Sequence, residues 1–338
     1  MKKTLRYFLF FSLMLLFAAV LAEGVLEIAF RIKDRHAHPL PVRDYPYLYY
    51  LFDTTEGLNE YGFKTHYPIE KQEGKFRIIL TGGSVARGKK PEESIAHYLE
   101  KELKARFNTD KIEVMNAGIS AFVVEQEFIL IQLLLQQYHP DMIVSLDGVN
   151  DLMTFDFNRR TQSDFELPPH HWDEVKVIEP NRARRRILTR FPLFFINIAR
   201  VIAYFKAQQF EKKYDWSQLT DERLKIVSET YWKIINDTHD FCKVKNIRYY
   251  NFLQPVRTCS QSRKGAQLSE REKAQCRLFE LMDSAVKNEP YNFSLTTLLD
   301  SRLELFYDFC HVLPAGNEVI ANTMAERVAD DVEAWMEY

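Results

Sequence analysis

The chain has 338 residues, 46% of them hydrophobic, and a formal net charge of -2. The apolar content excludes an intrinsically disordered chain, and the length fits one α/β domain of about 250 residues with added segments. Because charges of both signs are interspersed, no net field attracts nucleic acid, and we expect the function to reside in a local site rather than in a nucleic-acid partner.

Residues 1–30 carry a membrane-targeting pattern. The first six residues include three basic side chains, and residues 7–22 are apolar apart from Ser12. This is typical of a secretion signal, either cleaved after Ala22 or kept as an anchor. The apolar pattern continues over Val25–Phe30, so we favour an uncleaved signal anchor over a cleaved signal or a buried helix of the fold. With the basic end in the cytoplasm, the rest of the chain would be periplasmic or extracellular.

Residues 31–74 are rich in charge, proline and tyrosine and are expected to form an irregular lead-in. The main domain is expected over residues 75–338, where short apolar runs alternate with amphipathic helical patterns. We predict strands at 76–80, 111–115, 142–146 and 247–253, and helices at 92–107, 124–137, 221–244, 269–287 and 315–336.

An insertion at about 152–215 interrupts this alternation. A basic run, Arg182–Arg186, precedes a largely apolar stretch, Phe191–Phe205. The stretch could be a helical lid over a ligand-binding face, and the basic run could rest on an anionic membrane surface. Solvated basic residues beside a packed helix are the more ordinary explanation.

The alternation predicts a mostly parallel central sheet with helices on both faces, a three-layer α/β/α sandwich of the flavodoxin-like type. Ligands of such sheets bind outside the carboxyl ends of the strands. The first three predicted strands end in small or polar residues, namely Gly82-Gly83-Ser84, Asn116-Ala117-Gly118 and Asp147–Asp151. We therefore expect a functional site at this edge of the sheet.

The four cysteines gain meaning if the domain lies in an oxidising compartment. Cys259 and Cys276 bracket a polar, charged stretch and could form one disulfide, whereas Cys242 and Cys310 would stay free or pair. No Cys-x-x-Cys spacing occurs, so we expect no structural zinc site.

Ser84 is a candidate nucleophile because it follows a strand and a glycine turn. A serine hydroxyl reacts at neutral pH only beside a base, and that base needs a group that holds its tautomer. Asp308 and His311 are three residues apart and would share one face of a helical turn. The carboxylate could then orient the imidazole towards Ser84. A helix-end ion pair is the ordinary alternative for this spacing.

Acyl transfer also needs hydrogen-bond donors for the oxyanion. Three candidates are the backbone N–H groups of Ser84 and Gly118 and the side-chain amide of Asn150. Gly118 suits a place where the backbone approaches a ligand without a Cβ. The alternative is that Gly118 and Asn150 are only turn residues.

These motifs, taken in order, resemble those of the SGNH hydrolase family, the GDSL-type esterases and lipases. Gly82-Gly83-Ser84 is similar to the first block, with Gly83 in place of the family's common aspartate, and Gly118 is similar to the second. Gly148–Asp151 matches the third block and Asp308–His311 the last. The resemblance covers about residues 75–330, and the insertion has no clear equivalent.

The resemblance implies a catalytic triad of Ser84, His311 and Asp308 and an oxyanion hole formed by Ser84, Gly118 and Asn150. The implied activity is that of a carboxylic ester hydrolase that needs no metal or organic cofactor. We expect a membrane-anchored esterase that removes an O-acyl group, in particular O-acetyl, from a carbohydrate or a cell-envelope polymer. Two alternatives are an O-acyltransferase that passes the same acyl group to a glycan, and a non-catalytic envelope binding protein built on this fold.

Overall fold

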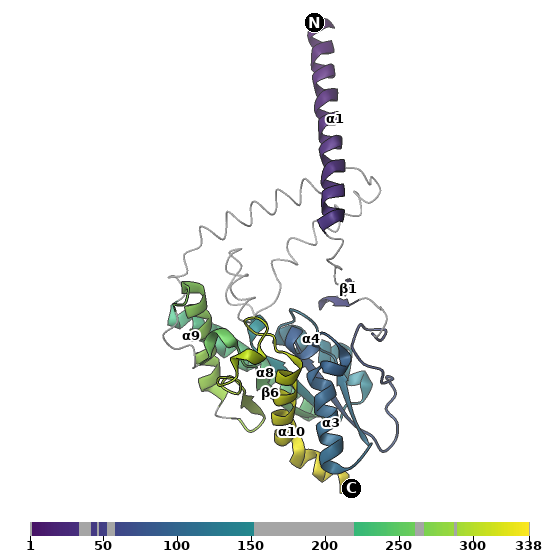
Figure 1. Cartoon of the computed structure of the whole chain (residues 1–338). Helices are drawn as coiled ribbons and strands as arrows, with labels where there is room; N and C mark the ends of the chain where they lie inside the picture. The colour runs from purple at the N-terminus through teal and green to yellow at the C-terminus, as the bar shows by residue number, and fades with distance from the viewer. Residues whose placement is uncertain are drawn as a thin grey trace. The chain divides into compact units, whose positions relative to one another are not determined.

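A computed structural model describes most of the chain, namely residues 2–33, 42–45, 47–52, 58–151, 220–260, 267–286 and 289–337 (Figure 1). The chain divides into two units, one made of residues 1–41 and 174–215 and the other of residues 42–173 and 216–338. The first unit is described through helix α1 (Lys2–Lys33) alone. The predicted insertion at about 152–215, with its basic run Arg182–Arg186, lies outside the described residues.

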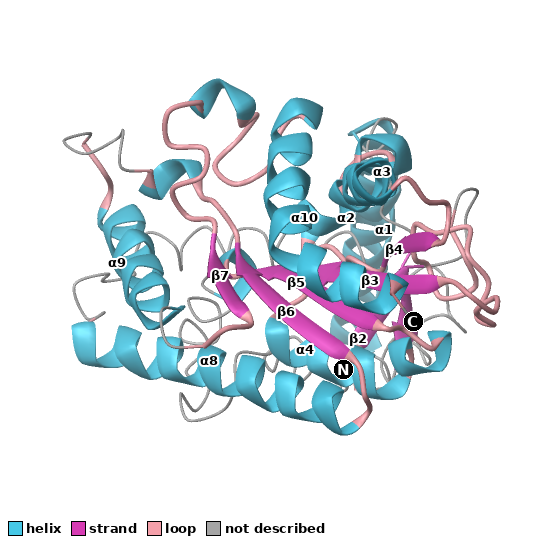
Figure 2. Ribbon diagram, turned by 90° about the horizontal axis from the view of Figure 1, so that it is seen from below, coloured by secondary structure: helices cyan, strands magenta, loops and turns pink. Residues whose placement is uncertain are grey.

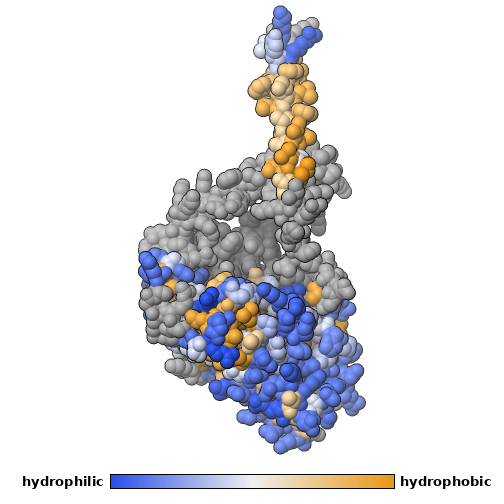
Figure 3. Space-filling view, in the orientation of Figure 1, coloured by the Kyte–Doolittle hydropathy of each residue, from blue (hydrophilic) through white to orange (hydrophobic). Residues whose placement is uncertain are grey.

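Helix α1 contains an apolar stretch, Lys3–Leu26, that is long enough to cross a membrane, with a mean hydropathy of 2.3 and none of it buried. Figure 3 shows apolar side chains along this helix below a hydrophilic tip. A signal sequence has the same length and composition. Retention as an anchor and cleavage as a signal therefore both remain predictions.

The second unit is built on a five-stranded sheet in which every neighbouring pair is parallel. The strand order is β4-β3-β5-β6-β7, so the order reverses beside β3, as in flavodoxin-like sheets. Its strands are β3 (Phe76–Gly82), β4 (Ile112–Asn116), β5 (Met142–Asp147), β6 (Arg248–Leu253) and β7 (Asn292–Ser294). Every residue of β3, β4 and β5 is buried, as a sheet covered on both faces requires.

Helices cover the two faces of this sheet (Figure 2). Helices α3 (Ile95–Phe107) and α10 (Pro314–Met336) lie on one face, and α4 (Val124–Leu133) and α8 (Asp221–Val244) lie on the other, with α9 (Glu270–Ala285) packed against α8. The predicted three-layer α/β/α fold is confirmed. The shorter helices are α2 (Ser84–Arg87) and the 3-10 turns η1 (Pro91–Glu93), η2 (Leu135–Tyr138), η4 (Arg257–Cys259) and η7 (Leu303–Leu305).

The lead-in is more regular than the sequence predicts. Strands β1 (Val42–Tyr45) and β2 (Tyr49–Phe52) form an antiparallel hairpin around Tyr47, whose φ is 66°. Leu48, Leu51 and Phe63 are fully buried in the core of the second unit. Part of the segment expected to be irregular therefore contributes to the main hydrophobic core, because removing its apolar side chains from water lowers the free energy of the folded state.

The cysteines pair as one of the sequence interpretations suggests. A disulfide joins Cys259 of η4 to Cys276 of α9, while Cys242 and Cys310 are free and buried. In the sequence, the residues between the two cysteines are mostly polar and charged. It restricts the unfolded chain and thereby favours the folded state.

Candidate active site

Ser84 lies where strand β3 passes into helix α2, at the carboxyl edge of the sheet. The turn depends on Gly82, which has a φ of 140°. A Cβ on Gly82 would lie 2.6 Å from the Ala86 Cβ and 2.6 Å from the carbonyl oxygen of Leu146. Only glycine fits this close passage between α2 and β5, and the passage brings the Ser84 hydroxyl to the edge where ligands of such sheets bind.

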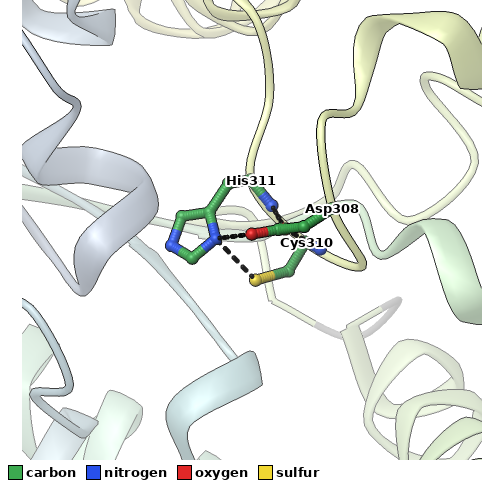
Figure 4. A group of neighbouring side chains, drawn as sticks. All are labelled: Asp308, Cys310 and His311. Carbon is green, nitrogen blue, oxygen red and sulfur yellow. Dashed lines mark hydrogen bonds and ion pairs between the residues drawn. The ribbon is translucent and has the colours of Figure 1, made fainter. Parts of the chain in front are cut away.

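The structure brings together the three side chains predicted to form a triad. The Nε2 atom of His311 lies 2.7 Å from the Oγ atom of Ser84. On the other side of the ring, Nδ1 lies 2.7 Å from Oδ2 of Asp308 (Figure 4). The hydroxyl, the imidazole and the carboxylate thus form one continuous chain of hydrogen bonds, with the spacing that proton transfer requires.

The local geometry of Asp308 and His311 differs from the predicted helical turn. Both residues lie in a loop before α10, closed by a bridge between Phe306 and Val312. Oδ1 of Asp308 accepts hydrogen bonds from the backbone N–H groups of Cys310 at 2.9 Å and His311 at 2.7 Å. An aspartate that binds the N–H groups two and three residues ahead stabilises a turn without a helix. The carboxylate therefore holds its own loop with one oxygen and the imidazole with the other.

The electrostatics of the loop keep Asp308 ionised. Burial alone would raise the pKa of Asp308, but the hydrogen bonds from the backbone N–H groups of Cys310 and His311, and then from the His311 imidazole, hold it below its usual value. An ionised carboxylate stabilises the imidazolium that forms when histidine accepts a proton. The loop thus supplies the charge that a histidine base needs.

The Cys310 thiol is the other polar neighbour of the imidazole, with Sγ 3.6 Å from Nδ1 of His311. Burial, followed by the charge of Asp308, raises the pKa of Cys310 to about 12. The thiol is therefore protonated at neutral pH and is not a competing nucleophile. Asp308, Cys310 and His311 offer donor atoms close enough to hold a metal ion, but the imidazole and carboxylate atoms already bond to each other and to Ser84.

The three predicted oxyanion donors are placed differently. The backbone N–H of Ser84 begins helix α2, where the first N–H groups have no acceptor within the helix. The Nδ2 atom of Asn150 donates one hydrogen bond to the carbonyl oxygen of Phe122 at 2.8 Å, and its second proton lies outside that bond. The N–H of Gly118 donates to Oδ1 of Asn116 at 3.0 Å. Of the three, Gly118 is thus the one with no proton left for an oxyanion, because its single N–H already has an acceptor.

Gly118 has a structural reason to be glycine. A Cβ there would lie 2.6 Å from the backbone nitrogen of Arg87. The loop after β4 therefore packs directly against the backbone of α2, the helix that begins with Ser84. This close packing supports the position of the serine even though the Gly118 N–H bonds elsewhere.

Gly83, which replaces the aspartate common in the resembling family, proves to touch the site. A Cβ on Gly83 would lie 2.0 Å from Nδ2 of Asn150 and 3.3 Å from its Cγ. No side chain can occupy position 83 while the Asn150 amide stays where it is. The sequence interpretation assigned Gly83 only to the turn, and the structure shows that its missing side chain makes room for the amide.

A cluster of buried carboxyl groups lies at the start of α4 and the end of β5, and the sequence interpretation did not predict it. Glu127, Asp147 and Asp151 are all buried. Oδ1 of Asp151 accepts a hydrogen bond from the backbone N–H of Val124 at 3.1 Å, which ties the helical segment after β5 to the start of α4. The sequence interpretation placed Asp151 in the third motif block and gave it no catalytic role. The available signal was a glutamate on the same helical face as the apolar residues of 124–137.

Burial raises the pKa of all three carboxyl groups. For Asp151 burial, followed by the charge of Asp147, raises the pKa to about 8. For Asp147 burial also raises the pKa, and for Glu127 burial followed by the charge of Asp147 raises it strongly. Carboxyl groups that must share a dry space do not all ionise, so the cluster retains protons at neutral pH.

This cluster predicts that stability declines as the pH rises. The pKa of Asp151 is about 8 in the folded chain and about 3.9 in an unfolded one. Because the folded state binds the proton more tightly, the stabilisation is complete below about pH 4 and is lost as the pH rises towards 8. Asp151→Asn keeps an oxygen for the Val124 N–H and cannot ionise. We expect a shallower fall in the free energy of unfolding between pH 5 and pH 9, measured by urea titration.

A matched control is the exposed carboxylate of Asp110, which lies in the turn before β4. Asp110→Asn is expected to keep the wild-type pH dependence. Parallel stability curves for wild type and Asp151→Asn would contradict a protonated, buried Asp151.

A pocket of about 230 Å³ opens beside Ser84 and His311. Its wall is formed by the segment after α2 and the loop before α10, including Lys89, Tyr307 and Leu313. The nucleophile and base thus face a space that a ligand can enter. The remaining lining residues are Val85, Gly88, Glu93, Val312, Pro314 and Asn317.

No protein-family description matches the chain, and no curated protein does so. Among solved structures, an acetyl xylan esterase named AlAXEase is 13% identical, with a TM-score of 0.44, and the match covers 75% of this chain and 100% of that one. Axe2, an acetylxylan esterase from Geobacillus stearothermophilus, is 11% identical, with a TM-score of 0.43 and coverage of 76% and 96%. LAE5, an alpha/beta hydrolase enzyme from the metagenome of Lake Arreo in Spain, is 14% identical, with a TM-score of 0.43 and coverage of 75% and 95%.

Proposed function

We propose that this protein is a serine esterase that hydrolyses an O-acyl ester. The observation that carries the proposal is the unbroken hydrogen-bond chain from Asp308 through His311 to Ser84. It joins a nucleophile to a base, and the base to an ionised carboxylate. A purely structural serine has no need of such an arrangement at the carboxyl edge of a parallel sheet, beside an open pocket.

In the proposed reaction the Ser84 oxygen attacks the carbonyl carbon of the ester while Nε2 of His311 takes the hydroxyl proton. The tetrahedral intermediate collapses, the carbon–oxygen bond to the alcohol breaks, and His311 returns the proton to the leaving oxygen. Water then attacks the acyl carbon while Nε2 of His311 takes one of its protons. The bond between that carbon and Oγ of Ser84 breaks, His311 returns the proton to Oγ, and the carboxylic acid leaves. Asp308 keeps the imidazole in the required tautomer throughout.

The intermediate carries a negative oxygen, and its stabilisation is assigned to two donors. These are the backbone N–H of Ser84 and the second amide proton of Asn150. One such donor contributes about 100- to 1,000-fold in rate. Gly118 would join them only if its N–H left Asn116, so we assign Gly118 a supporting role through its packing on α2.

The size of the pocket supports a short acyl group. Its volume is about 230 Å³, whereas pockets for drug-sized ligands typically span about 300–1,000 Å³. We therefore propose an acetyl ester, carried by a carbohydrate or a cell-envelope polymer. If α1 is retained as an anchor, the domain would act outside the cytoplasm at the membrane surface.

The proposal predicts turnover of acetyl esters by the purified protein. With 4-nitrophenyl acetate and 4-nitrophenyl octanoate, we expect kcat/KM to be at least about tenfold higher for the acetyl ester, because extra methylenes overfill the pocket. Acetate release from O-acetylated xylan, followed by chromatography, extends the test to a glycan. Preference for the octanoyl ester would contradict the short-acyl assignment, and transfer of acetyl to added glycan hydroxyls rather than to water would identify an acyltransferase.

A further inference from the structure

Lys89 lines the same pocket as Ser84 and His311. It follows α2 directly, two residues beyond Arg87 at the end of that helix. Its backbone is held from outside the helix, because Nζ of Lys64 donates to the carbonyl oxygens of Gly88 at 2.6 Å and Lys89 at 2.7 Å. These hydrogen bonds hold the backbone of Lys89 at the pocket wall, and its side chain is exposed.

An aromatic ring connects the Lys89 ammonium with the catalytic imidazole. The Nζ atom of Lys89 lies 3.7 Å from the centre of the Tyr307 ring. The Tyr307 ring in turn stacks on His311, with the centroids 5.5 Å apart and an interplanar angle of 14°. The cation–π contact restrains the ammonium near the pocket without neutralising its charge.

The charge of Lys89 is left available for a ligand. Among the described residues no ion pair of Lys89 is found, whereas the adjacent Lys90 pairs with Glu93 at 2.9 Å. Glu93 also lines the pocket, but its Oε1 atom is the one that Lys90 engages. An ammonium in a pocket, restrained by a ring and not paired with a carboxylate, favours an anionic ligand.

We propose that Lys89 binds a carboxylate of the substrate, so that the preferred substrate is an acylated acidic polysaccharide rather than a neutral one. The inference rests on the esterase function proposed above and adds the substrate's charge to it. Lys89 acts in substrate binding, because the ammonium is positioned by Tyr307 beside the hydrogen-bonded pair of His311 and Ser84. The acyl group enters at Ser84, and the acidic group of the same or a neighbouring sugar meets Lys89.

The test compares two polymers with similar acetyl content, O-acetylated polygalacturonate and O-acetylated xylan, by the rate of acetate release. We expect the wild type to prefer the acidic polymer, and added NaCl to weaken that preference by screening. In Lys89→Gln the ratio of kcat/KM for the acidic polymer to that for xylan should fall about tenfold, the effect of losing one charged hydrogen bond. Lys89→Arg should restore most of the ratio, mainly through KM.

The matched control is Lys111→Gln, which removes an exposed ammonium directly before β4, at the end of that strand away from the pocket, and is expected to keep the wild-type ratio. An unchanged ratio in Lys89→Gln, or an equal fall in Lys111→Gln, would overturn the inference. Wild-type protein that hydrolyses 4-nitrophenyl acetate but shows no preference for the acidic polymer would also overturn the inference. That result would leave the esterase proposal intact. A wild type that hydrolyses none of these esters would overturn the esterase proposal, and this inference with it.

Discussion

Replacing Ser84 with alanine is expected to lower kcat/KM for an acetyl ester by about 10⁴- to 10⁶-fold, the range seen when a triad nucleophile is removed. The reason is that no other described hydroxyl lies 2.7 Å from Nε2 of His311. His311→Ala should cause a loss of the same order. Because the two residues act as one unit, the double variant should be little worse than either single variant, as measured by initial rates with 4-nitrophenyl acetate.

The control for this series is Ser284→Ala, which removes an exposed hydroxyl that bonds to the carbonyl oxygen of Leu281 on α9. It should keep wild-type activity. Thermal unfolding should show that Ser84→Ala folds like the wild type, because the Oγ atom bonds only to the imidazole among the described residues. Full activity in Ser84→Ala would contradict the proposed mechanism.

A side chain at position 83 is expected to cost about 100- to 1,000-fold in kcat, the value of one oxyanion donor. The Cβ of Gly83→Ala would lie 2.0 Å from Nδ2 of Asn150 in the present structure, so the amide must move. Gly83→Asp should cause at least as large a loss, although aspartate is common at this position in the resembling family. The effect should appear in kcat more than in KM, because the donor acts on the transition state.

Asn150 provides the comparison that tests this coupling. Asn150→Ala should lose about as much kcat as Gly83→Ala, and the double variant should lose no more than either, because both changes remove the same donor. A double loss equal to the product of the single losses would show that Gly83 acts independently of the amide. Wild-type kcat in Gly83→Ala would show that the Asn150 amide is not needed where it lies.

Local sequence patterns were sufficient to predict the main helices and strands of the fold. The 24-residue helix α8 has the predicted bounds, Asp221–Val244, because its apolar residues repeat with helical spacing over many turns. Strand β7, with 3 residues, is too short to carry a pattern. The hairpin of β1 and β2 was missed because charge and proline dominate the segment, while the burial of Leu48 and Leu51 depends on tertiary contacts.

The candidate site was predictable in its residues and less so in its geometry. Motif order was enough to select Ser84, Asp308 and His311, and the structure places them in contact. Their loop conformation was not predictable, since an Asp-x-x-His spacing suits a helix and an aspartate turn alike. The hydrogen bond from the Gly118 N–H to Asn116 is local, an asparagine turn that the Asn-x-Gly spacing permits without requiring it. The contact between position 83 and Asn150 joins segments that are far apart in the chain, which a one-dimensional pattern does not contain.

The central claim is that Ser84 is an activated nucleophile, and covalent labelling tests it most directly. The purified protein is incubated with a fluorophosphonate, digested, and mapped by mass spectrometry. We predict one phosphonylated site, Ser84, with labelling lost in Ser84→Ala and slowed by at least about 1,000-fold in His311→Ala. Folded wild-type protein that stays unlabelled, or that is labelled at another residue, would contradict the account.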